Sequence, residues 1–213
     1  MSQHVLIIAT RYDAAANYTY EWAQRLRDDL LTSSNCASCL ILDGESLCRS
    51  GSSLIEAIER AEYVVFYGHG SADQWIALPT GVASATVPLV DSASVQVLDG
   101  RQVYAACCDS LTNLGQAFAT SFKTQSPTPD FIGYSSAFDF SMENSDEFRK
   151  VIHDSVRDFI LGSSSAATIA SNQKAAWDQL DKAFSIGGSL QTRPAAAFAA
   201  SCARSNALSI GYA

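Results

Sequence analysis

The fold is decided by residues 63–70, whose sequence is YVVFYGHG. The first five of these residues form a continuous apolar run, which is typical of a strand buried on both faces of a parallel sheet. A second run of this kind, QVYAACC at residues 102–108, ends in two cysteines. Parallel strands present their ligand-binding residues beyond their carboxyl ends. We therefore expect His69 and Cys107 to share one edge of the sheet.

The rest of the chain predicts an alternation of strands and helices. Strands are expected at residues 5–9, 40–42, 131–134 and 207–212. Helices are expected at residues 17–31, 53–60 and 111–122, on both sides of Gly162 and after Pro194. Residues 71–100 are rich in small residues and prolines and are expected to form a long ordered loop. The order predicts an α/β fold with a mostly parallel central sheet and helices on both faces, which is a three-layer sandwich.

The two strand ends carry a possible nucleophile and its base. A cysteine attacks as its thiolate, and a neighbouring imidazole can take the thiol proton. Gly68 and Gly70 flank His69, and they allow the backbone to bend there and to approach a substrate closely. Ser110 or Thr112 is expected to cap a helix, whose partly positive N-terminus would favour a thiolate at Cys107.

These residues resemble the caspase-type cysteine peptidases of clan CD, which include caspases, metacaspases, legumains, gingipains, separases and the bacterial CHAT peptidases. In this family an apolar run ending in His-Gly precedes a second apolar run ending in Ala-Cys, and residues 63–70 and 102–108 fit both runs. The CHAT branch is the most similar, because its members continue with a helix, a strand ending in Ile-Gly and a helix pair split by a glycine. The resemblance covers residues 62–184.

The resemblance implies a caspase-like fold and a cysteine endopeptidase with a Cys-His dyad. Cys107 is expected to be the nucleophile, because Ala106-Cys107 matches the Ala-Cys pair of the family, and Cys108 is not. His69 would protonate the departing amine. The backbone N–H groups of Gly70 and Cys107 would form the oxyanion hole. No metal or organic cofactor is implied, and the sequence shows no third member of a triad.

Specificity is expected to come from an acidic side chain near the cysteine. Relatives bind the residue before the cleaved bond with a charged group, and the acidic candidates here are Asp139, Asp73 and Asp109. An unpaired carboxylate would bind Arg or Lys, so we predict cleavage after these residues, with Asp139 as the leading recognition residue. Trp75 would either line the substrate groove or cover the edge of the sheet.

Composition limits the partners and the location of the protein. The 213 residues carry a formal net charge of −8 without a cluster of Lys and Arg, which argues against binding to nucleic acid or to an anionic membrane. Residues 1–213 are expected to form a single domain. The N-terminus lacks the pattern of a signal peptide, so a cytoplasmic location with free cysteines is expected.

Two other functions remain open at this point. The chain could be a catalytically inactive caspase-like module that binds a protein partner, or a thiol redox switch that uses the adjacent Cys107 and Cys108. CHAT relatives often carry sensor domains, and this chain shows none. We therefore expect a regulatory or sensor protein outside the chain, in addition to a protein substrate.

Overall fold

A central sheet of six strands organises the computed structural model, which describes residues 3–44, 51–78, 86–124, 129–162 and 164–213, with backbone alone at residues 51 and 52. The strands follow the order β2-β1-β3-β7-β8-β9 across the sheet, and only β9 runs antiparallel to its neighbour. Their bounds are β1 Gln3–Ala9, β2 Cys36–Asp43, β3 Tyr63–Tyr67, β7 Gln102–Ala106, β8 Phe131–Tyr134 and β9 Ile210–Tyr212.

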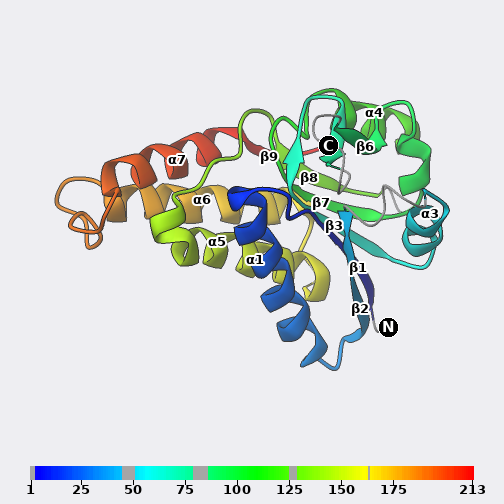
Figure 1. The fold of residues 1–213 in the computed structure, drawn as a ribbon, viewed down its shortest axis with the longest axis horizontal. Helices are drawn as coiled ribbons and strands as arrows, with labels where there is room; N and C mark the ends of the chain where they lie inside the picture. The colour runs from blue at the N-terminus through cyan, green and yellow to red at the C-terminus, as the bar shows by residue number, and fades with distance from the viewer. Residues whose placement is uncertain (1–2, 45–50, 79–85, 125–128, 163) are drawn as a thin grey trace.

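Helices cover both faces of this sheet (Figure 1). One face packs against α1 (Ala14–Leu31), α5 (Ser145–Leu161), α6 (Ala166–Phe184) and α7 (Ala196–Ser209). The other face packs against α3 (Gly51–Glu59) and α4 (Asn113–Phe122). The architecture is therefore a three-layer α/β sandwich with a mostly parallel sheet, as the sequence predicts.

Successive residues of each central strand belong to different cores. Along β1, Val5 and Ile7 face the layer of α1, whereas Leu6 and Ile8 face the layer of α3 and α4. All four are apolar because both faces of the strand are covered. This is why apolar and polar residues do not alternate along the strand. The sequence pattern alone therefore does not show which face of the sheet each side chain points to.

A small second sheet occupies much of the segment that is predicted to be a loop. It is antiparallel and consists of β4 (His69–Gly70), β5 (Gln74–Ala77) and β6 (Val87–Asp91), and a 3₁₀ helix at Val95–Leu98 follows. The loop prediction for residues 71–100 is therefore wrong for the described residues, while residues 79–85 lie outside them. The strands are short, and a proline interrupts β6, which is tolerated because β6 is an edge strand.

Side chains that cap the helices explain two of the helix starts. Asp13 precedes α1 and its Oδ1 accepts a hydrogen bond of 2.8 Å from the N–H of Ala16, so the helix begins three residues before the predicted start. Ser165 caps α6 in the same way. The predicted cap Thr112 does precede α4, but its side chain makes no capping hydrogen bond. The same holds for Asn144, which precedes α5.

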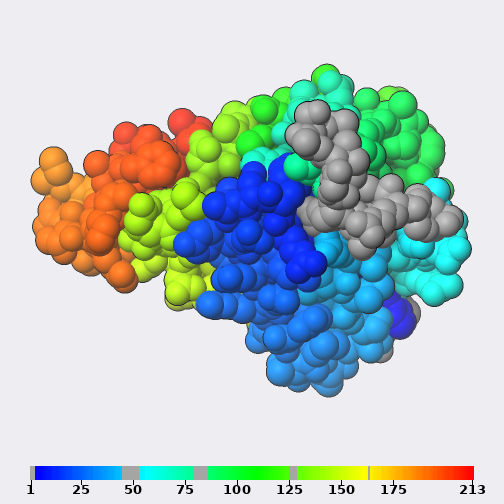
Figure 2. Space-filling view, in the orientation of Figure 1, coloured from blue at the N-terminus to red at the C-terminus, as the bar shows by residue number. Residues whose placement is uncertain are grey.

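The helical layer extends beyond the sheet. In Figure 2 the connection between α6 and α7, coloured orange, protrudes at the left, and α1, coloured blue, lies at the centre of the same face. Within the described ranges, none of the helices has the length and apolar character required to cross a membrane.

Candidate functional site

The pairing of β3 with β7 brings the segments that carry His69 and Cys108 to the same edge of the sheet. The last paired residues of these parallel strands are Tyr67 and Ala106, so two residues further along each chain lie His69 and Cys108. The side chain of Cys107 belongs instead to the core under α3 and α4, with an exposed fraction of 1%. The two cysteines thus lie on opposite faces of the sheet, as neighbours on a strand do.

His69 and Cys108 line one cavity of about 230 Å³ on the α1 side of the sheet. The first turns of α1 form one wall. The loop after β8 forms the other wall, with Phe138, Asp139 and Phe140. Met142, in the short 3₁₀ helix Met142–Asn144, is half-exposed at this wall. The cavity is therefore apolar along most of its lining and holds one thiol, one imidazole and one carboxylate.

The thiol of Cys108 is held by the backbone of Phe138. The Phe138 N–H donates to Cys108 Sγ at 3.4 Å, and the thiol donates to the Phe138 carbonyl at 3.8 Å. Burial raises the pKa of Cys108, and it raises the pKa of Cys107 further. The α4 helix begins only at Asn113. The predicted lowering of the Cys107 pKa is therefore wrong, since burial raises this pKa.

Gly70 lies directly against the cysteine pair. A Cβ atom at this position would be 2.6 Å from Cys107 Sγ and 3.1 Å from the carbonyl oxygen of Cys108. A side chain here would push β4 away from the end of β7. The glycine thus allows the segment that carries His69 to approach the backbone of the cysteines.

A tight turn follows Cys108, and hydrogen bonds from Asp109 and Ser110 hold it in place. Asp109 adopts a left-handed conformation with φ of 55°, and its N–H donates to the carbonyl of Ser136 at 2.9 Å. The buried hydroxyl of Ser110 accepts the N–H of Tyr134 at 3.1 Å and donates toward the carbonyl of Cys107 at 3.3 Å. These contacts hold the cysteine pair against the end of β8.

His69 has an acidic partner that the sequence reasoning missed. Its Nε2 lies 2.8 Å from Asp13 Oδ2, and its ring lies 5.4 Å from that of Tyr12, centroid to centroid. Both partners belong to the connection between β1 and α1, at the same edge of the sheet as the cysteines. The signal that could have found Asp13 is its position, since an acidic helix cap directly after a buried strand must lie at the carboxyl edge.

The other predicted binding residues do not gather in one place. Trp75 is wholly buried and stacks on Phe66 at a centroid distance of 4.8 Å, so it forms part of the core and does not line the cavity. Of the two roles expected for Trp75, lining the substrate groove is therefore wrong, whereas its burial against Phe66 agrees with the role of apolar cover for the sheet. Asp73 accepts a hydrogen bond from Asn113 at 2.8 Å, beside the start of α4. Asp109 lies in the turn that follows Cys108.

Asp139 is the one predicted acid that lines the cavity. Its backbone is bracketed by Asn206 of α7, whose Oδ1 accepts the Asp139 N–H at 3.1 Å and whose Nδ2 donates to the Asp139 carbonyl at 2.8 Å. Its side chain is exposed. Within the described ranges of the chain, no hydrogen bond or ion pair is formed by its carboxylate. A cationic group in the cavity could therefore bind it.

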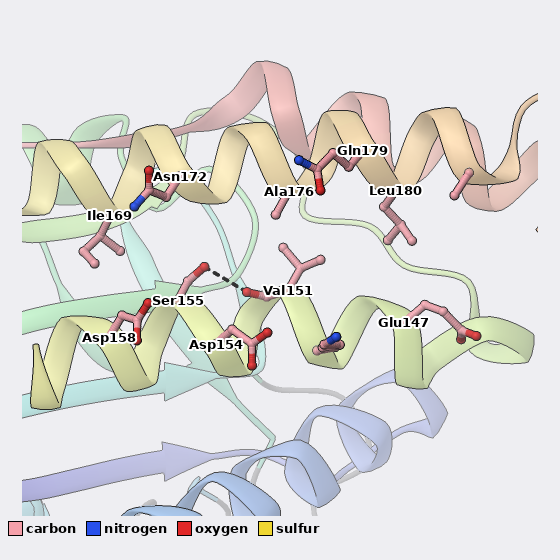
Figure 3. Close-up of a pocket in the computed structure, with 12 residues that line it drawn as sticks. Glu147, Val151, Asp154, Ser155, Asp158, Ile169, Asn172, Ala176, Gln179 and Leu180 are labelled. Atoms are coloured by element: carbon pink, nitrogen blue, oxygen red, sulfur yellow. Dashed lines mark hydrogen bonds between the residues drawn. The ribbon is translucent and has the colours of Figure 1, made fainter. Parts of the chain in front are cut away.

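A larger groove of about 430 Å³ lies between α5 and α6 (Figure 3). Its lining combines apolar side chains such as Val151 and Leu180 with charged and amide side chains such as Asp154, Lys150 and Asn172. The hydroxyl of Ser155 donates to the carbonyl of Val151 at 2.8 Å, so it is engaged in the helix. None of the predicted site residues lines this groove, and its lining contains neither histidine nor cysteine.

Comparison with known proteins adds no assignment. No family model matches the chain, and no curated protein matches it. In the part of the chain that the structure describes, no three His, Cys, Asp or Glu side chains are grouped so that they could hold a metal ion. The chemistry of the site must therefore be inferred from its own residues.

Proposed function

We propose that the protein is a cysteine peptidase in which Cys108 is the nucleophile and His69 is the acid and base. The observation that carries this proposal is that Cys108 and His69 line the same cavity at the ends of adjacent parallel strands. Cys107 takes no part in the chemistry in this proposal, because its thiol is buried in the opposite core. The proposal thus keeps the Cys-His dyad of the sequence analysis and moves the nucleophile by one residue.

The reaction uses one proton that is exchanged between the two side chains. Since burial raises the pKa of Cys108, the resting residue is a thiol, and His69 takes its proton as the substrate carbonyl arrives. The sulfur bonds to the carbonyl carbon, the C–N bond breaks, and the departing nitrogen takes the proton from His69. Water then attacks the thioester, which releases a carboxylic acid and restores the thiol.

Charge on the carbonyl oxygen would be stabilised by the backbone. Gly70 and Cys108 lie next to each other, since the Gly70 position approaches the Cys108 carbonyl closely. Their N–H groups replace the predicted pair of Gly70 and Cys107 as the oxyanion hole in this proposal. One such donor contributes about 3 kcal/mol to stabilisation of the transition state.

The cavity suits a long cationic side chain before the cleaved bond. The aliphatic part of an Arg or Lys would pack along Phe138 and Phe140, and its charged end would bind the unpaired carboxylate of Asp139. We therefore keep the prediction of cleavage after Arg or Lys, with Asp139 as the recognition residue. Asp73 has no part in it, because the side chain is bound beside α4.

Labelling by peptidyl chloromethyl ketones tests nucleophile and specificity together. Three reagents that differ only in the last residue, Arg, Leu or Asp, would be incubated with the protein and the adduct located by mass spectrometry. We expect the Arg reagent to label Cys108 fastest, Cys107→Ala to react normally, and Cys108→Ala to be inert. Asp139→Asn should remove the advantage of the Arg reagent over the Leu reagent.

The same experiment separates the proposal from its alternatives. Labelling of Cys107, or labelling that persists in His69→Ala at the wild-type rate, would contradict the proposed dyad. A folded protein that reacts with none of the reagents would favour a non-catalytic module that binds a protein. The side chains of Cys107 and Cys108 point to opposite faces of the sheet, which argues against a redox switch between them. Such a switch would require a disulfide that forms without loss of the fold. A regulatory partner remains part of the proposal.

A further inference from the structure

The connection between β1 and α1 contacts the imidazole of His69 through Tyr12 and Asp13. Asp13 Oδ2 lies 2.8 Å from His69 Nε2, and the ring of Tyr12 lies against the imidazole at an interplanar angle of 33°. The side chain of His69 is 42% exposed. The hydrogen bond and the ring contact therefore orient the imidazole.

The carboxylate of Asp13 is itself held in place. Its second oxygen, Oδ1, accepts the N–H of Ala16 at 2.8 Å and so caps α1. One carboxylate oxygen is therefore bound to the helix and the other to the imidazole. The direction of the Asp13–His69 hydrogen bond is thus coupled to the position of α1, which also forms a wall of the cavity.

We propose that Asp13 is a positioning residue that holds His69 in the tautomer with the proton on Nε2 and leaves Nδ1 free to accept the proton of Cys108. A carboxylate only accepts hydrogen bonds, so the nitrogen that faces Asp13 carries the hydrogen. The other ring nitrogen is then the base. This inference rests on the proposed function, and it extends the Cys-His dyad to a group of three residues that the sequence did not show.

The chain supplies a second Asp-His pair for comparison, although its histidine is less exposed than His69. His153 Nε2 lies 3.2 Å from Asp29 Oδ2, and Arg157 also binds that carboxylate at 2.9 Å. This second Asp-His pair is formed between α1 and α5, and neither of its residues lines the cavity of His69 and Cys108. It provides a histidine with the same kind of partner outside the proposed site.

Nitrogen-detected NMR of the ¹⁵N-labelled histidine side chains tests the inference, with His69→Gln used to assign the signals. In the wild type we expect the Nε2–H tautomer at His69. In Asp13→Asn the amide can keep its oxygen on Ala16 and turn its NH₂ toward His69, so the Nδ1–H tautomer should become the major one. Asp13→Ser keeps a good helix cap but cannot reach the ring, so both tautomers should be present.

The kinetic readout is the rate at which the Arg chloromethyl ketone labels Cys108. Asp13→Asn should lower this rate by roughly 10²-fold, which is the lower part of the range for a general base, and Asp29→Asn should leave it unchanged. The inference is overturned if the His69 tautomer is the same in the wild type and in Asp13→Asn. If the tautomer changes but the wild type is never labelled, the positioning of His69 stands and the proposed hydrolysis fails.

Discussion

The close approach of Gly70 to Cys107 gives the sharpest prediction about stability. In Gly70→Ala the new methyl group would lie 2.6 Å from Cys107 Sγ, roughly 1 Å inside an ordinary contact. The sulfur cannot move into solvent, because Cys107 is 1% exposed. Overpacking of this kind costs about 1 to 3 kcal/mol in the free energy of unfolding. At about 2 to 4 °C per kcal/mol for a chain of this size, the melting temperature should fall by about 2 to 12 °C.

A second substitution tests the cause of that loss. Cys107→Ala removes the sulfur that is nearest to the new methyl group, so Gly70→Ala should cost at least about 1 kcal/mol less in that background than in the wild type. Chemical denaturation of the two single variants and of the double variant measures this difference. Gly211→Ala is the matched control, since the one atom near the new methyl group is the end of the Leu111 side chain, at 3.1 Å. Costs that add within about 0.5 kcal/mol would refute the contact.

Two further predictions concern buried polar groups. Gln173 accepts the hydroxyl of Tyr104 at 2.9 Å and donates to the hydroxyl of Tyr134 at 2.9 Å, so Gln173→Leu should lower the free energy of unfolding by about 1 to 3 kcal/mol. The exposed Gln179→Leu on the same helix should change it by less than about 0.5 kcal/mol, and equal losses would rule out the network as the cause. Burial raises the pKa of Cys39 to about 12, so between about pH 9 and pH 12 the unfolded chain loses a proton that the folded chain keeps. Stability should therefore fall as the pH rises through this window, and Cys39→Ala should make the fall shallower; an unchanged slope would contradict the assignment.

The sequence predicts the positions of the central strands better than the directions of their side chains. Apolar runs at residues 63–67 and 102–106 are sufficient to place two buried strands side by side. Such runs look alike in either register, because every residue is covered on both faces. The choice between Cys107 and Cys108 depends on the pairing of Tyr67 with Ala106, and no local pattern encodes that pairing.

The partner of His69 could not be predicted for a related reason. Asp13 and His69 are 56 residues apart, and they meet only because β1 and β3 are neighbours in the sheet. The antiparallel strands β5 and β6 were missed because they are short and because Pro88 interrupts the run of strand-forming residues. Helix α6 was easier to place, since Ser165 and the apolar residues that follow are local signals.

The side chains of Cys107 and Cys108 point in opposite directions, so the residue that affects folding and the residue that affects reactivity are different neighbours in the sequence. A new side chain at position 107 lies in a closed core, so its size and polarity determine the yield of folded protein. Substitutions at position 108 enter a cavity, so they change what reacts there far more than whether the chain folds. In a library randomised at both positions, a screen for soluble expression should therefore select mainly among residues at position 107. A screen for reaction with a thiol reagent should select mainly among residues at position 108.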